Sequence, residues 1–164
     1  MFFSKLYIIV FSVFLFFFPA ETVQEGKVRV YSGTSAYSSD IICTVDGEKL
    51  YKGRSPYSSD ILMNIRSNKI YKERSVYSSD VLYTIRGDAV YKGNSSYSSD
   101  IVATFRGNRI YEGRSSYSSD VLVHIRDGRI YSGVSDYSRD IMASYKGNLT
   151  REQLVMVLHY LGVL

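Results

Sequence analysis

The sequence predicts a mainly β fold in which about twelve short antiparallel strands form a closed barrel around an apolar C-terminal helix. Three observations favour this fold: a repeat with a period of 20 residues, two strand-like segments in each repeat, and a final segment with apolar residues on every side. We expect six repeats to form one β domain over residues 27–149, and residues 150–164 to form a helix of the same domain. An open array of hairpins is the alternative architecture.

The repeat is visible as columns of identical residues. The tetrapeptide Tyr-Ser-Ser-Asp recurs without insertion and returns once more as Tyr-Ser-Arg-Asp, with its tyrosine at positions 37, 57, 77, 97, 117 and 137. A second tyrosine column begins at Tyr31, and a serine column begins at Ser35. A gap-free period of this length indicates one supersecondary unit that packs against copies of itself.

Each repeat contains the pattern of a β-hairpin. Residues 81–86 and 89–92 are rich in β-branched and aromatic side chains and flank the two-residue step Gly87-Asp88. The equivalent steps are mostly Gly, Asn, Asp or Ser, which tolerate positive φ in tight turns; they are 47–48, 67–68, 107–108, 127–128 and 147–148. A propeller needs about four strands per blade, so twelve strands are too few for one. A barrel or an open array remains.

The C-terminal segment favours the barrel. Thr150 and Gln153 have the spacing of a capping box, which predicts a helix that begins at Arg151. Residues 154–164 have apolar side chains in every direction, yet a helix over residues 151–164 spans only about 21 Å, too short to cross a membrane comfortably. Such a helix needs a surrounding wall, and a ring of twelve strands has a radius of about 11 Å, enough to enclose it.

Alternation along the first strand of each hairpin predicts which face is inside. Apolar residues at positions 41, 43 and 45 and their equivalents are expected to face the helix. The intervening column is polar and is expected to face outward: Thr44, Asn64, Thr84, Thr104, His124 and Ser144. The orientation of the tyrosine columns stays open, because a one-residue change in register would reverse it.

Residues 1–20 have the layout of a secretory signal. Lys5 precedes an apolar run at residues 6–18, and Pro19-Ala20 ends it. The run is shorter than the roughly 20 residues of a spanning helix, but bulky Phe18 is unfavourable near a cleavage site. A cleaved signal peptide, an uncleaved anchor and a buried N-terminal strand are the three interpretations. The first two predict an exported protein, either periplasmic, extracellular or membrane-anchored.

Composition argues against several functional classes. A net charge of +4 and a pI near 9.1 are mild for a nucleic-acid-binding protein, and export makes that partner less suitable still. The single cysteine, Cys43, excludes an internal disulfide. His124 and His159 have no catalytic partner at a telling spacing, so we predict no enzyme, cofactor or metal site. The aspartate column that begins at Asp40 supplies one carboxylate per repeat, which fits turn bonding better than calcium.

Basic residues flank the tight turns and should gather on one rim of the barrel. This basic rim consists of Lys49, Arg66, Lys69, Arg86, Arg106, Arg109, Arg126, Arg129 and Lys146. Recurrent like charge suggests a ligand such as anionic lipid headgroups or envelope polymers, whereas a solvated rim without a ligand is the simpler interpretation. A carbohydrate-binding module that uses the tyrosine columns is the alternative function.

Six tandem two-strand repeats followed by a capped apolar helix resemble the bacterial β-flower proteins, which are shallow symmetric barrels. By extension, the pattern is similar to tubby-like and scramblase-related barrels, which have twelve strands around a central hydrophobic helix. The resemblance rests on repeat architecture over residues 27–164, and it implies a non-enzymatic, membrane-associated role. The Tyr-x-Gly element also resembles MORN repeats, which form open hairpin arrays, but the second glycine-rich half of that motif is missing.

Overall fold

The computed structural model describes residues 26–164, so the predicted signal peptide or anchor at residues 1–20 lies outside the described residues. The described chain forms twelve strands and one α-helix, α1 (Arg151–Tyr160). The strands are β1 (Val28–Ser32), β2 (Ile41–Asp46), β3 (Lys49–Lys52), β4 (Ile61–Arg66), β5 (Lys69–Lys72), β6 (Val81–Arg86), β7 (Ala89–Lys92), β8 (Ile101–Arg106), β9 (Arg109–Glu112), β10 (Val121–Arg126), β11 (Arg129–Ser132) and β12 (Ile141–Tyr145).

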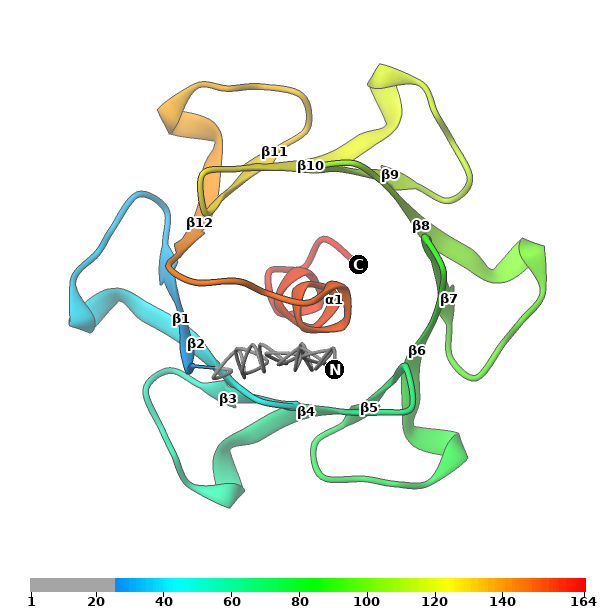
Figure 1. The fold of residues 1–164 in the computed structure, drawn as a ribbon, viewed down its shortest axis with the longest axis horizontal. Helices are drawn as coiled ribbons and strands as arrows, with labels where there is room; N and C mark the ends of the chain where they lie inside the picture. Colours follow the sequence, from blue (N-terminus) through cyan, green and yellow to red (C-terminus); the bar gives the residue numbers. More distant parts are fainter. Residues whose placement is uncertain (1–25) are drawn as a thin grey trace, which may run out of the picture.

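The strands form a closed antiparallel barrel, which confirms the predicted fold and excludes the open array. Each strand pairs with its neighbours in sequence, and β1 closes the ring by pairing with β12, with Val30 opposite Tyr145. Figure 1 shows the ring from one end, with α1 at its centre. The prediction of a sixth tight turn at Gly147-Asn148 was wrong. There the chain leaves the wall and enters α1, and β1 supplies the missing partner of β12.

The two ends of the barrel are built differently. At one end, two-residue turns join the strands of each hairpin, and we call this end the tight-turn rim. At the other end, eight-residue loops project outward as six petals, each containing a single-turn 3-10 helix (Figure 1). The petals are residues 33–40, 53–60, 73–80, 93–100, 113–120 and 133–140.

The tight turns require backbone conformations that suit small residues. The first residue of every two-residue turn has positive φ, for example 57° at Gly87 and 60° at Gly107. Ser67 and Asp127 take the same position with φ of 48° and 52°, which is less favourable for residues with a Cβ. Five of the six predicted tight turns are therefore confirmed.

The barrel interior is filled by α1. Leu158 and Met156 of the helix are completely buried against wall residues such as Leu50 and Ile110. The capping box predicted from the sequence is present: the Thr150 hydroxyl accepts from the Gln153 backbone N–H, and the Gln153 side chain accepts from the Thr150 N–H. The helix ends at Tyr160, four residues earlier than predicted.

The predicted alternation is correct for two of its three columns. Positions 43 and 45 belong to the central core, represented by Cys43 and Val45. Position 41 does not, because a β-bulge shifts the register between positions 41 and 43 in each repeat. Ile41 and its equivalents lie outside this central cluster, all of them buried except the half-buried Ile101, and the residues at position 42 pack against the core in their place. One inserted residue thus gives the wall a second, outer set of buried side chains.

Candidate functional site

The basic rim residues lie at the tight-turn rim, and several face each other across hairpins. The register places like charges directly opposite in three of the five hairpins: Arg66 with Lys69, Arg106 with Arg109, and Arg126 with Arg129. Like charges in directly opposed positions destabilise a sheet. Only the first hairpin places opposite charges together, with Asp46 across from Lys49.

Carboxylates compensate few of these cations. Within residues 26–164, Arg126 is the one member of the basic rim with a carboxylate in ion-pair range, at 3.5 Å from Asp127 and 3.6 Å from Asp136. Arg86 and Arg106 instead lie over tyrosine rings, each 6.0 Å from the ring centroid. Most cations of the rim therefore have no carboxylate partner among residues 26–164.

The helix and the N-terminal strand both begin at this same rim. The Arg151 guanidinium donates to the Gly87 carbonyl and forms an ion pair with Asp88 at 3.0 Å. The Gln153 side chain donates to the Gly47 carbonyl at 2.9 Å, which ties α1 to a second tight turn. The chain enters the barrel at Val28, opposite Val45, so residues before position 28 join the barrel at the basic end.

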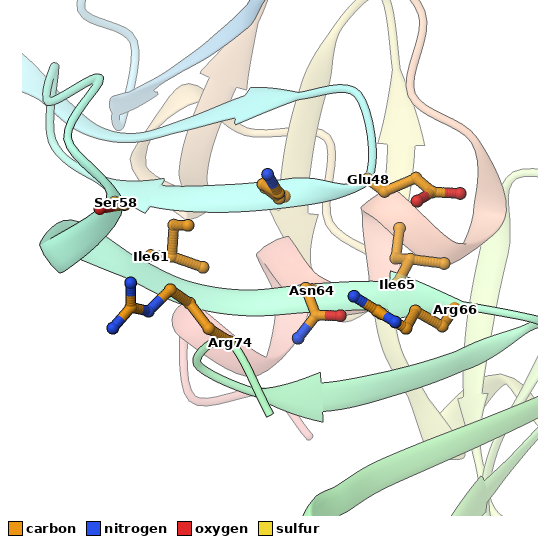
Figure 2. Close-up of a pocket in the computed structure, with 8 residues that line it drawn as sticks. Glu48, Ser58, Ile61, Asn64, Ile65, Arg66 and Arg74 are labelled. Atoms are coloured by element: carbon orange, nitrogen blue, oxygen red, sulfur yellow. The ribbon is translucent and has the colours of Figure 1, made fainter. Parts of the chain in front are cut away.

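A groove lies on the outer wall between the second and third petals (Figure 2). It has a volume of about 270 Å³, and we call it the Arg74 groove. Its lining includes three cations from three segments, namely Lys49, Arg66 and Arg74, together with one carboxylate, Glu48, and the polar residues Ser58 and Asn64. A smaller cavity of about 180 Å³ lies beside β12, at the position that the repeat makes equivalent to the Arg74 groove.

Each petal is held in shape by its own serine and aspartate. In the first petal the Ser35 hydroxyl donates to the Asp40 carboxylate and accepts from the Tyr37 backbone N–H. The Asp40 backbone N–H donates to the Tyr37 carbonyl. The same three bonds recur in every petal, which confirms turn bonding as the role of the aspartate column. In the fifth petal, hydrogen bonds from Ser115 and Ser119 lower the pKa of Asp120.

The two tyrosine columns have different environments. Tyrosines of the Tyr31 column are half-buried, and Tyr111 and Tyr131 are fully buried. Tyrosines of the Tyr37 column are exposed on the petals, with 68–77% of their surface accessible. Only the second column is open to a ligand.

The polar column at position 44 fastens each petal to the wall. Thr84, for instance, donates to the Gly93 carbonyl at 2.8 Å, and His124 contacts the Gly133 carbonyl through Nδ1 at 3.0 Å. His124 also contacts the Asp136 carboxylate through Nε2 at 2.9 Å and stacks on Tyr131. The sequence did not predict the contact with Asp136. The sequence does contain a sign of this contact: His124 and Asp136 lie in the same repeat, and each differs from the residues at the equivalent positions of the other repeats.

The two remaining titratable side chains of interest lie inside the barrel. Burial raises the pKa of the Cys43 thiol to about 12, which makes it a poor nucleophile. His159 lies near the petal end, where its Nδ1 is 3.0 Å from the Tyr83 hydroxyl. Within residues 26–164, no three His, Cys, Asp or Glu side chains are grouped so that they could hold a metal ion. Over the same residues, no helix has the length and apolar character needed to span a membrane.

A model of the 6-fold beta flower protein family matches residues 30–158. No curated protein and no solved structure matches the chain. The matched range runs from β1 to the buried part of α1, so it includes all six repeats and the wall that they close. The chain therefore belongs to the 6-fold beta flower protein family.

Proposed function

We propose that the protein is a non-enzymatic, exported binding protein of the cell envelope, and that its basic rim contacts an anionic lipid surface or an anionic envelope polymer. The observation that carries this proposal is the set of like-charged pairs at the tight-turn rim, exemplified by Arg106 and Arg109. A fold with five tight turns could place neutral or opposite charges there at no cost to its core. An external anion gives the repeated positive charge a physical reason.

The point of chain entry supports a membrane-facing orientation of this rim. Seven residues, 21–27, separate the apolar N-terminal run and its Pro-Ala end from β1. Such a linker reaches at most about 25 Å. Because β1 begins at the tight-turn rim, an uncleaved anchor would keep the basic rim next to headgroups. Each Lys or Arg near an anionic surface contributes about 1 kcal/mol of attraction.

Vesicle flotation tests the proposal with the chain that lacks residues 1–20. Wild-type protein is expected to float with vesicles that contain phosphatidylglycerol, less so at high salt, and not with neutral phosphatidylcholine vesicles. The test variant combines Arg106→Glu, Arg109→Glu and Arg129→Glu at the rim. The control combines Lys52→Glu, Arg54→Glu and Arg114→Glu toward the petal end, which changes the net charge equally.

Loss of flotation in the rim variant but not in the control would support membrane contact. Equal loss in both variants would reduce the effect to net charge and contradict a role for the rim. If wild-type protein ignores vesicles but binds an anionic cell-wall polymer through the same three residues, the ligand is the polymer. Binding to neither would leave a solvated rim.

Carbohydrate binding is the second candidate, and the exposed Tyr37 column is the observation that favours it. Aromatic rings with most of their surface accessible can stack against sugar rings, and six of them surround the barrel in equivalent petals. A glycan array tests this with wild-type protein and a variant with Tyr57→Ala, Tyr77→Ala and Tyr97→Ala. A glycan bound only by the wild type would support this function, and no bound glycan would exclude it.

A further inference from the structure

We propose that the Arg74 groove, which shares Lys49 and Arg66 with the basic rim, is a site for a phosphorylated ligand whose phosphate carries at least two negative charges. This inference rests on the proposed function in one respect, since both require an anionic ligand. It goes further by assigning one groove among six related surfaces and by naming the chemical group. Four observations carry it: the convergence of cations, their lack of internal partners, the asymmetry of the repeats, and the size of the groove.

Three cations reach the groove from separate parts of the chain. Lys49 begins β3, Arg66 ends β4, and Arg74 belongs to the third petal. In the view of Figure 2, Asn64 lies between the side chains of Arg66 and Arg74, and the Glu48 carboxylate points away from them. Lys49 and Arg66 lie on neighbouring strands because β3 pairs with β4, and the third petal adds Arg74 to the same groove.

The cations of the groove have no carboxylate partner within residues 26–164. Asn64, a polar residue of the lining, already commits both protons of its amide nitrogen, to the carbonyls of Glu73 and Ser75 at 2.8 and 3.0 Å. Asn64 therefore fixes the base of the third petal, and hence the petal that carries Arg74. The positive charge remains free for an external anion.

The repeat makes the asymmetry of this groove measurable. Among the five residues equivalent to Arg74, only Arg54 and Arg114 are also basic; the rest are Thr34, Asn94 and Val134. The groove of Arg54 has Asp46 where this one has Arg66, and the groove of Arg114 has Ala89 where this one has Lys49. Three cations occur together at one position only. A symmetric scaffold needs no such difference for folding.

The chemistry of the groove suits phosphate. Guanidinium groups bind phosphate oxygens through paired N–H donors, and a lysine adds a compact charge. Three cations exceed what a single carboxylate needs and match the double charge of a phosphate monoester or of a diphosphate. A volume of about 270 Å³ holds the phosphate and a small group attached to it. The phosphate can belong to a lipid headgroup or to a soluble molecule.

The test uses Arg74→Asn, because Asn94 shows that asparagine is accommodated at this position of a petal. Arg114→Asn is the control, since it removes the same charge from the same place in another petal. Inorganic pyrophosphate, followed by NMR titration, tests a soluble source. Flotation with vesicles that contain phosphatidic acid, compared with phosphatidylglycerol vesicles of equal surface charge, tests a lipid source.

We expect Arg74→Asn to weaken binding of the phosphate probe about tenfold, the effect of losing one charged hydrogen-bonding group, and Arg114→Asn to leave it within twofold. Loss in the pyrophosphate assay indicates a soluble ligand, and loss confined to phosphatidic acid indicates a headgroup. Equal effects of the two variants, or no binding of either probe, would overturn the site. The rim variant Arg106→Glu, Arg109→Glu, Arg129→Glu leaves this groove unchanged, so failure of the rim proposal and failure of this one are distinguishable.

Discussion

The two ends of the barrel use the same repeat in opposite ways. At the petal end, each aspartate has a serine partner within its own loop, and the arrangement is the same in all six petals. At the tight-turn rim, charged side chains differ between repeats, and most lack a partner within residues 26–164. Columns that repeat identically therefore build the fold, and columns that vary on a symmetric frame are where to seek a ligand.

The largest expected effect comes from the enclosed helix, which the walls at both ends surround. Leu158→Asp places an unpaired carboxylate at a completely buried position, which costs about 4 kcal/mol or more. We expect loss of cooperative thermal unfolding and binding of a hydrophobic dye. Leu158→Met, which conserves volume, should cost less than about 1.5 kcal/mol. A cooperative, dye-negative Asp variant would contradict the role of α1 as the core.

A pair of glycine substitutions can show that two tight turns differ in how much a Cβ destabilises them. Gly128 and Gly107 both have positive φ, at 69° and 60°. A Cβ on Gly128 would collide with the Tyr145 carbonyl oxygen, whereas one on Gly107 meets no atom within 4 Å. Gly107→Ala should cost about 1 kcal/mol from strain alone, and Gly128→Ala about 3 kcal/mol or more. Urea unfolding measures both, and equal values would show that the turn beside β12 relaxes freely.

The attachment of the petals should contribute a smaller amount. Thr84→Val keeps the shape of a buried side chain but removes its hydrogen bond to the Gly93 carbonyl, which should cost about 1–2 kcal/mol. Thr34→Val changes an exposed petal residue in the same chemical way and should stay within about 0.5 kcal/mol. If the two variants unfold at the same urea concentration, the position-44 column does not fasten the petals.

The smallest effect concerns acid. Hydrogen bonds from Ser115 and Ser119 lower the pKa of Asp120 in the folded state. A lowered folded pKa means that the ionised carboxylate stabilises the fold above its unfolded pKa, and that this contribution disappears as the pH falls through the folded pKa. In an NMR titration, Ser115→Ala should raise the pKa of Asp120 toward its ordinary value. Ser95→Ala, the same change in another petal, should leave it unchanged.

The architecture could be predicted from the sequence because the same pattern of strand and turn residues recurs in six repeats. Strand positions and tight turns follow from a local pattern that recurs with one period, and the capped apolar segment at the C-terminus favoured the closed barrel over the open array. The outward orientation of the side chain at position 41 could not be predicted from the sequence. The β-bulge that causes it leaves the alternation of apolar and polar residues unchanged. The prediction of a hairpin at 147–148 was also wrong. The strand that pairs with β12 is β1, which lies more than a hundred residues earlier in the chain.

The sequence predicted the basic rim but not the Arg74 groove. The spacing of basic residues around the turns was enough to place nine cations at one rim. The Arg74 groove was not, because its three cations come from segments whose proximity depends on the bulge and on the outward direction of a petal. Arg74 itself occupies a column that is basic in three repeats and Thr, Asn or Val in the others, which gave no reason to group it with Lys49.

Closure of β1 onto β12 sets the number of repeats that the chain can carry. In an open stack of repeats, a duplicated unit adds one more layer and disturbs only its neighbours. In this ring, another 20 residues would add two strands and widen the barrel, and the same α1 would leave a void around itself. Gain or loss of a single repeat is therefore a change to the whole molecule, and the length of this region can vary only together with the helix that fills it.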